Sequence, residues 1–280
     1  MQHKTQAIAK EWIIIKAESP ERKLPMVNMK NTDSREDYKA THTPGQIAER
    51  LENGPDSIYL KDFIYGAIDG AVTTFAVVAG VAGAGLSSGI IIILGLANLL
   101  ADGFSMAISN YLGTRAENQL RDKAREREFD EIHHYPQGER EEVRQIYAKK
   151  GFQGQLLEDV VEVITADKTR WVDVMIQEEH GMVLEDHNAT KGGLATFAAF
   201  CLIGLIPLLP YLVNWFIADV ITAPFLWSSI LTGIAFVSVG AMKSRFVNQH
   251  WLMASLETLA IGGVAAILAY AVGVLLKGVV

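Results

Sequence analysis

The chain has 280 residues, half of them apolar, and a net charge of -7. Residues 115–190 contain 18 acidic and 11 basic residues, so this stretch accounts for the whole net charge. Nucleic-acid binding requires basic patches, so an acidic module of this kind excludes nucleic acid as a partner and suits cations instead. The single cysteine, Cys201, excludes a disulfide framework within the chain and a zinc site made of several cysteines.

The apolar residues are gathered into five runs that are almost free of charged residues. The runs cover residues 63–84, 89–112, 192–213, 220–242 and 251–276. Each exceeds the roughly 18 residues that indicate a membrane span, and at about 1.5 Å per residue each can cross a hydrocarbon core of about 30 Å. The sequence therefore predicts five transmembrane helices.

Basic residues around these runs predict their orientation. Those at ends that would share one side of the membrane are Lys61, Arg115, Arg121, Lys191, Lys243 and Arg245, and only Lys277 lies opposite. Cytoplasmic loops carry the excess of Lys and Arg. We therefore expect the amino terminus, the charged middle and the turn at 243–250 to face the cytoplasm, and the carboxyl terminus to face away.

Residues 1–57 precede the first apolar run and have mixed charge. They contain four prolines and one apolar cluster, Trp12 to Ile15, which is too short for a signal peptide or a span. We expect a partly disordered cytoplasmic arm with one short helix.

The first apolar run carries Asp62, Tyr65 and Asp69 on one helical face. Asp69 lies about two turns inside the membrane boundary, where a charged carboxylate costs about 2.5–3.5 kcal/mol even on insertion scales. It is therefore a candidate functional residue; the alternative is a structural hydrogen bond to a neighbouring helix. Gly66 and Gly70 would allow close helix approach, either inside the bundle or at a dimer seam.

The second run places Asn98, Asp102, Met106 and Asn110 at intervals of four residues, which makes a polar stripe along one helix. A thioether suits softer transition-metal ions better than Mg²⁺ or Ca²⁺. A methionine by itself more often only packs. The stripe as a whole nevertheless offers a metal both carboxylate and thioether ligands.

The second helix is expected to continue beyond the membrane, because nothing before Tyr135 and Pro136 stops it. Glu117 and Glu128 are 11 residues apart, close to three turns, so they share a face that has Glu131 near its edge. These acids either bind a cation or belong to a solvated ladder of ion pairs.

The rest of the charged middle predicts two more helices, near 139–150 and 153–166, and a helical segment with the sequence TRWVDVMIQEEHGM. In that segment Met175 and Glu179 are four residues apart and would face one way. Together with the acids of the long helix, this pair could close around divalent cations.

The last three runs carry fewer polar signals. Pro207 and Pro210 should kink or break the outer end of the third run. Glu257 begins the fifth run as a second acid near the membrane. It could carry protons or pair with Lys243 or Arg245.

Several motifs, in this order and spacing, resemble the vacuolar iron transporter family over residues 58–280. They are YGAIDGAVTTFAVVAGVAGA, GLANLLADGFSMAISNYLG, WVDVM followed by EE, IPLLPY and ETLAIGGVAA. The resemblance implies an all-α, five-helix polytopic membrane protein with a cytoplasmic helical metal-binding domain inserted between transmembrane helices 2 and 3. The domains expected are 1–57, 58–114, 115–190 and 191–280.

The resemblance also implies an activity. Members of the family form homodimers and move Fe²⁺, and often Mn²⁺, out of the cytosol in exchange for protons. This implies a transporter in a lipid bilayer rather than an enzyme, with the metal as its transported and regulatory ion and no permanent cofactor. Asp69 and Met106 match the family's intramembrane ion site. The cytoplasmic metal positions are matched by Glu117, Glu128, Glu131, Met175 and Glu179.

The chain departs from the family pattern at three positions where glutamates can occur. These are Asn98, Leu120 and Ile176. Fewer carboxylates should mean fewer or weaker cytoplasmic sites, and Asn98 cannot exchange a proton. Nearby acids that could substitute are Asp102, Asp122 and Glu178.

Two other functions are open from the sequence. Glu131 and His134 form a Glu-x-x-His motif, which di-iron oxidases use in helical bundles, although a second copy would have to come from another subunit. The charged middle could also act as a membrane-anchored metal sensor or buffer without transport.

Overall fold

The structure is a computed structural model that describes residues 42–279, except 54–58, 186, 218–219 and 248. The chain divides into two units between residues 56 and 57. Most of the expected arm, residues 1–57, lies outside the described residues; within 42–53 the structure has one short helix, α3 (Pro44–Asn53). All elements discussed below belong to the second unit.

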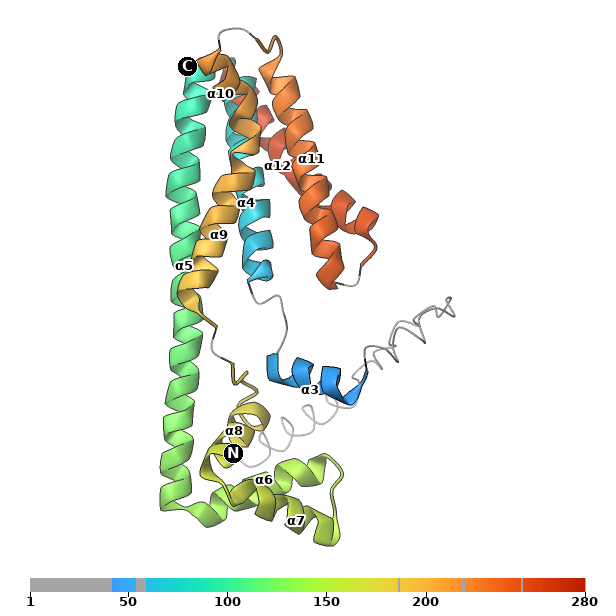
Figure 1. Ribbon diagram of the computed structural model, residues 1–280. Helices are drawn as coiled ribbons and strands as arrows, with labels where there is room; N and C mark the ends of the chain where they lie inside the picture. The colour runs from blue at the N-terminus through green and yellow to red at the C-terminus, as the bar shows by residue number, and fades with distance from the viewer. Residues whose placement is uncertain (1–41, 54–58, 186, 218–219, 248, 280) are drawn as a thin grey trace, which may run out of the picture. The chain divides into compact units, whose positions relative to one another are not determined.

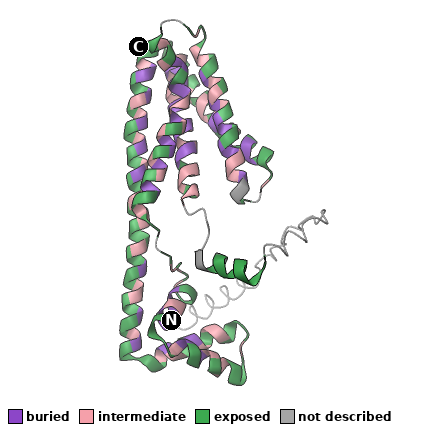
Figure 2. Cartoon of the chain, viewed as in Figure 1, coloured by how far each residue is buried: buried purple, intermediate pink, exposed green. Residues whose placement is uncertain are grey.

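The regular elements that the structure describes are all helices, and five segments are long and apolar enough to cross a membrane. These are α4 (Leu60–Gly83), α5 (Ser88–His134), α9 with η1 and α10 (Ala189–Gly204, Ile206–Leu208 and Leu209–Phe216), α11 (Pro224–Val247) and α12 (Trp251–Leu276) (Figure 1). Large apolar side chains remain exposed on these helices, as contact with lipid requires. Figure 2 shows exposed residues along the spanning helices. The five predicted spans are confirmed.

Helix α5 is continuous over 47 residues. At about 1.5 Å per residue it is roughly 70 Å long, more than twice the thickness of a hydrocarbon core. Its apolar half packs in the bundle, and its charged half continues to the small helices α6–α8 (Figure 1). It ends at His134, and Pro136 begins the next helix, where a proline is tolerated. The predicted extension of this helix is confirmed.

Glycines allow α4 to lie against two neighbours, α9 and α12. A Cβ added at Gly66 would clash with the backbone carbonyl of Thr196, and one at Gly70 with that of Phe200. Close backbone approach of this kind replaces hydrophobic burial as the source of helix association in lipid. Gly66 and Gly70 therefore allow close packing of α4 against α9 inside the bundle.

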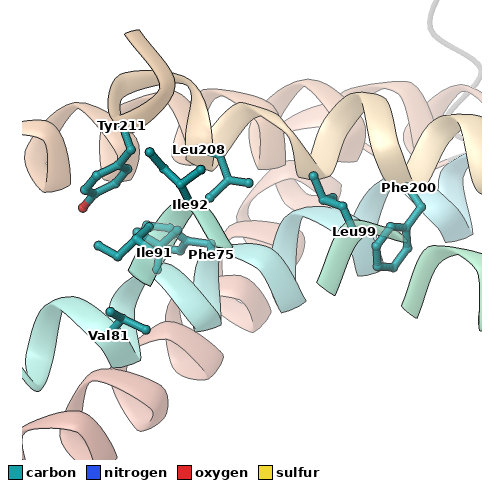
Figure 3. Close-up of a cluster of buried hydrophobic side chains, with 9 residues drawn as sticks. Phe75, Val81, Ile91, Ile92, Leu99, Phe200, Leu208 and Tyr211 are labelled. Atoms are coloured by element: carbon teal, nitrogen blue, oxygen red, sulfur yellow. The ribbon is translucent and has the colours of Figure 1, made fainter. Parts of the chain in front are cut away.

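An apolar cluster fills the space between α4, α5 and the third span. Figure 3 shows Phe75, Ile91 and Leu208 together at one end of the cluster, and Leu99 beside Phe200 further along. Phe200 and Leu208 have no exposed surface. This packing holds the two helices that carry the polar stripes in a defined register.

The third span is interrupted at its prolines, as predicted. Helix α9 ends at Gly204, a short 3-10 turn contains Pro207, and α10 begins beside Pro210. The hydroxyl of Ser228 donates a hydrogen bond to the carbonyl oxygen of Pro207 at 2.6 Å. A side chain of α11 thus satisfies a backbone group at the interruption.

The charged middle forms a small helical module from residues 115–134 of α5 and three short helices. These are α6 (Pro136–Lys149), α7 (Gly154–Thr165) and α8 (Lys168–Glu178). They enclose a second apolar cluster that includes Val143, Val161 and Val172. An ion pair of 2.6 Å between Arg125 and Asp173 joins α5 to α8.

Replacing Gly70 by alanine is expected to loosen the bundle, because the added methyl group would push α4 away from the Phe200 carbonyl. Gly263→Ala is the matched control: this glycine of α12 has open space around it, and alanine favours a helix by up to about 1 kcal/mol. Thermal unfolding in detergent should show a lower Tm for Gly70→Ala and an unchanged or higher Tm for Gly263→Ala. Equal values for the two variants would contradict this packing.

Candidate metal sites

A groove between α4 and α5 collects polar side chains within the membrane-spanning region. It has a volume of about 580 Å³ and is lined by Lys61, Asp62, Tyr65, Asp69, Asp102, Ser105, Met106, Ser109 and Asn110. The members from each helix are spaced by one, three or four residues, so one stripe of each helix faces the groove. The structure therefore brings the predicted residues Asp69 and Met106 to one place, and Asp102 joins them.

The groove combines two kinds of metal ligand. Asp69 and Asp102 offer carboxylate oxygens, and Met106, half-buried one turn beyond Asp102, offers a thioether. Carboxylates bind most divalent cations, whereas a thioether favours the softer transition-metal ions. The groove can therefore receive a divalent transition-metal ion without a cysteine or histidine.

Hydrogen bonds from Asn110 hold the part of the groove that this residue lines. Its amide donates to Oδ1 of Asp62 at 3.0 Å and to Oγ1 of the buried Thr196 at 2.7 Å. Asp62 and Asn110 also border a second hollow of about 350 Å³, which includes Glu117 and His187. The two residues thus lie between the membrane groove and the charged module.

Asn98 has a different role from the rest of its stripe. Its amide donates to Oγ1 of Thr73 at 3.3 Å and to Oγ1 of Thr74 at 3.5 Å. It is not among the residues that line the groove. Asn98 therefore joins α5 to α4, and the groove has Asp102 as its α5 carboxylate.

A second cluster of possible metal ligands lies in the helical module. Two sets of side chains place their ligand atoms within 4.8 Å of one another: Glu128, Glu179 and His180 form one, and Glu128, Glu131 and Glu139 the other. We call these five residues the acidic cluster. Glu128 belongs to both sets, so it lies at the centre.

Glu128 is buried because of its position on α5. It shares a helical stripe with Arg121 and Ile132, which face the other helices of the module. Only 1% of Glu128 is exposed, and its Oε2 has no hydrogen-bond partner among the described residues. Burial of an unpartnered carboxylate oxygen is unfavourable, and a bound cation would relieve it.

Glu131 lies at the edge of the acidic cluster, in contact with solvent. Its Oε1 accepts hydrogen bonds from Nε and Nη2 of Arg127 at 3.0 and 2.9 Å. At Glu131 the helix therefore has an ion pair of the kind expected for a solvated ladder of charges. Glu131 nevertheless remains close enough to Glu128 and Glu139 to share a cation with them.

The carboxylates of α6 were not among the metal ligands predicted from the sequence. Glu139 is 7% exposed and its Oε2 has no partner within the described part of the chain. Burial, and then the negative charges of Glu142 and Glu128, raise the pKa of Glu139 to about 7. Burial and the charge of Glu179 also raise the pKa of Glu142. The available signal was the position of Glu139 on the same buried stripe of α6 as Val143.

Two of the predicted ligands lie apart from the acidic cluster. Glu117 is exposed and lines the hollow beside Asp62. Met175 has no exposed surface and packs in the apolar core of the module with Val172 and Ile176. Their roles as metal ligands stay predictions.

Three other acids that were singled out in the sequence, Asp122, Glu178 and Glu257, lie outside both sites. Glu178 forms an ion pair with Lys150, and Asp122 is exposed on α5. Glu257 is 3.2 Å from Nζ of Lys243, which is the pairing that was one of its two alternatives. Of the substitutes, Asp102 alone lies in one of the two sites.

The fold and these two carboxylate-rich sites define an integral membrane protein of five spanning helices with the ligands to handle divalent cations. Residues 60–274 match the model of the VIT family. The chain therefore belongs to the VIT family.

Individual relatives agree with this assignment. The chain is 33% identical over 250 residues to the vacuolar iron transporter of Plasmodium berghei, covering 87% of this chain and 91% of that protein. It is 33% identical over 251 residues to that of Toxoplasma gondii, with coverage of 87% and 80%. With vacuolar iron transporter 1 of Arabidopsis thaliana it shares 32% identity over 212 residues, with coverage of 75% and 83%. The expected resemblance is confirmed, and the relatives are named as transporters rather than enzymes.

Glu139→Gln is expected to stabilise the metal-free protein at pH 8 but not at pH 4.5. The pKa of Glu139 is raised from its ordinary 4.5 to about 7, so the folded chain holds this proton more tightly than the unfolded chain. Wild type therefore loses stability as the pH rises through that window, whereas glutamine cannot ionise. Melting in EDTA at the two pH values measures the effect, with the exposed Glu162→Gln as control. A gain of equal size at both pH values would contradict it.

Proposed function

We propose that this protein is a proton-coupled transporter that exports Fe²⁺, and also Mn²⁺, from the cytoplasm across a membrane. The observation that carries the proposal is the groove in which Asp69, Asp102 and Met106 meet between two spanning helices. The names of two relatives also support the proposal: the similar proteins of Plasmodium berghei and Arabidopsis thaliana are named vacuolar iron transporters.

The ligand chemistry of the groove suits Fe²⁺ as cargo. Carboxylates alone would serve Mg²⁺ and Ca²⁺, which are abundant, equally well. The Met106 thioether adds an interaction that these hard ions do not use and that Fe²⁺ can use. Mn²⁺ relies more on the oxygen ligands, which makes it the second substrate.

The cation would reach the groove from the helical module, which we place on the cytoplasmic side by the distribution of basic residues. The acidic cluster would collect it first. Glu117 and Asp62 share the hollow that follows, and Asp62 also borders the groove. This gives a series of oxygen ligands from the module to Asp69, so the ion need not lose all its ligands at once.

Proton coupling would arise from competition between metal and protons at the same carboxylates. A metal needs its ligands deprotonated, so binding releases protons and protonation releases metal. Asp69 and Asp102 can both take part, whereas Asn98 cannot, and Asn98 lies outside the groove lining. The groove therefore retains Asp69 and Asp102, besides Asp62 next to Asn110, although one family acid is missing.

We further propose that the working unit is a homodimer. In the single chain Tyr65, Ser105 and Ser109 are exposed along the groove, at a level where the neighbouring surface is apolar. Polar surface in contact with lipid is unfavourable. A second copy placed over the groove would cover these side chains and double the set of ligands.

The two other functions receive less support. In a di-iron oxidase His134 would bind metal beside Glu131, but its Nδ1 lies 2.7 Å from the backbone oxygen of Asp130 and the ring is exposed. A sensor or buffer would need only the module, and it would not require a polar groove between spanning helices.

Asp69→Ala and Met106→Ala are each expected to reduce Fe²⁺ flux into proteoliposomes by about tenfold or more, because each removes a ligand of the translocated ion. Met253→Ala, an exposed methionine of α12 outside the groove, is the control and should transport normally. If Fe²⁺ flux were unchanged in both groove variants, the proposed path through the groove would be wrong. Metal binding by wild type with no flux would identify a sensor or buffer.

A pH gradient is expected to drive transport by wild type, with Fe²⁺ moving one way as protons move the other. Asp102→Asn should weaken this dependence, because it removes one of the groove carboxylates at which protons and metal can compete. Fe²⁺ and Mn²⁺ fluxes would be measured with and without the gradient, together with internal pH. Flux that is indifferent to the gradient in wild type would exclude proton coupling.

A further inference from the structure

His180 lies just beyond the end of α8, inside the acidic cluster, and the proposed function does not distinguish its contribution from that of the carboxylates. Its Nε2 is 2.8 Å from Oε1 of Glu128, and 22% of its side-chain surface is exposed. A carboxylate oxygen of Glu179 lies within 4.8 Å of the ligand atoms of both. The imidazole therefore forms one side of a compact set of possible ligands.

The backbone after α8 holds the imidazole in this place. The amide of His180 donates to the carbonyl oxygen of Met175 at 3.2 Å, and the amide of Met182 donates to that of Ile176 at 3.0 Å. Gly181, between them, has a φ of 65°, a left-handed conformation that glycine adopts readily. Met175 and Ile176 are fully buried, so the turn is attached to the core of the module.

A hydrogen bond between His180 and Glu128 does not by itself satisfy the buried oxygens or neutralise the negative charge of this site. Glu128 keeps a second buried oxygen without a partner among the described residues. Four carboxylates lie in the acidic cluster, and one imidazole cannot neutralise them even when protonated. The arrangement is therefore better suited to a divalent cation than to an isolated ion pair.

We propose that His180 is a nitrogen ligand of the cation held by Glu128 and Glu179, and that it biases the acidic cluster toward transition-metal ions over Mg²⁺ and Ca²⁺. This inference rests on the proposed function, in which the module collects the cargo. Imidazole suits Fe, Ni, Cu and Zn, whereas sites made of oxygen alone suit Mg²⁺, Ca²⁺ and Mn²⁺. A selectivity step thus precedes the thioether of the membrane groove.

The observed spacing fits coordination. With metal–ligand bonds of about 2.1 Å, adjacent ligand atoms of an octahedral ion are about 3.0 Å apart. The His180 nitrogen and the Glu128 oxygen, at 2.8 Å, are already close to that separation. Small side-chain movements of Glu179 would complete one face of the polyhedron.

The direct test is pulsed EPR of the full-length protein in detergent, loaded with less than one equivalent of Cu²⁺, a paramagnetic ion that imidazole suits. Wild type should show coupling between the copper electron spin and the imidazole nitrogen of His180. His180→Gln should lose this coupling, and His133→Gln, which changes an exposed histidine of the same module, should keep it. A hydrogen bond that only supports Glu128 would leave no nitrogen coupling in wild type, and that result would overturn the proposal.

A second measurement tests selectivity by equilibrium dialysis. His180→Gln should weaken binding of Co²⁺, an air-stable substitute for Fe²⁺, by about tenfold or more, while Ca²⁺ binding changes by less than about threefold. Equal weakening of both ions would show a structural role and would refute the selectivity claim. Liposome flux separates the two proposals: absent wild-type flux contradicts transport, whereas nitrogen coupling and ion preference decide the role of His180.

Discussion

The continuity of helix α5 is the constraint on which the rest of the structure depends. One uninterrupted helix of 47 residues carries Met106 and Asp102 within the membrane and Glu128 and Glu131 outside it. Its backbone hydrogen bonds are satisfied along its length, so the two sites are connected by a stiff element rather than by a loop. Their separation along the helix is therefore set by the number of residues between them.

The hydrogen bonding of polar side chains around α5 differs between the membrane bundle and the helical module. Inside the bundle, Asn98 does not line the groove and is paired with Thr73 and Thr74. In the module, by contrast, Glu128 and Glu139 keep buried oxygens that the described residues do not satisfy. An unsatisfied buried oxygen lowers the stability of the fold. A cation bound between Glu128 and Glu139 would supply the missing interactions of both oxygens.

The sequence predicted correctly those features of the fold that depend on neighbouring residues in the chain. The five spans, the length of α5 and the interruption at Pro207 follow from composition and from the geometry of proline, and the structure agrees with all three. Asp69 was found because an acid stands out in an apolar run, and Met106 because it lies on a stripe of polar residues and matches a family motif. Glu139 and His180 do not stand out in a charged segment, and only the packing of α6 and α8 against α5 shows that they meet Glu128.

The same packing explains why this chain can lack an acid at Ile176. That side chain has no exposed surface and lies in the apolar core of the module beside Met175, so a carboxylate there would need a buried partner. The acidic cluster contains Glu139 from α6 and an imidazole from the turn after α8. Both approach Glu128 from the rim of the core, which leaves the apolar contacts that hold the module together intact. In the proposed site the ligands therefore come from α5, α6 and the turn after α8, and His180 adds a nitrogen to a set of oxygens.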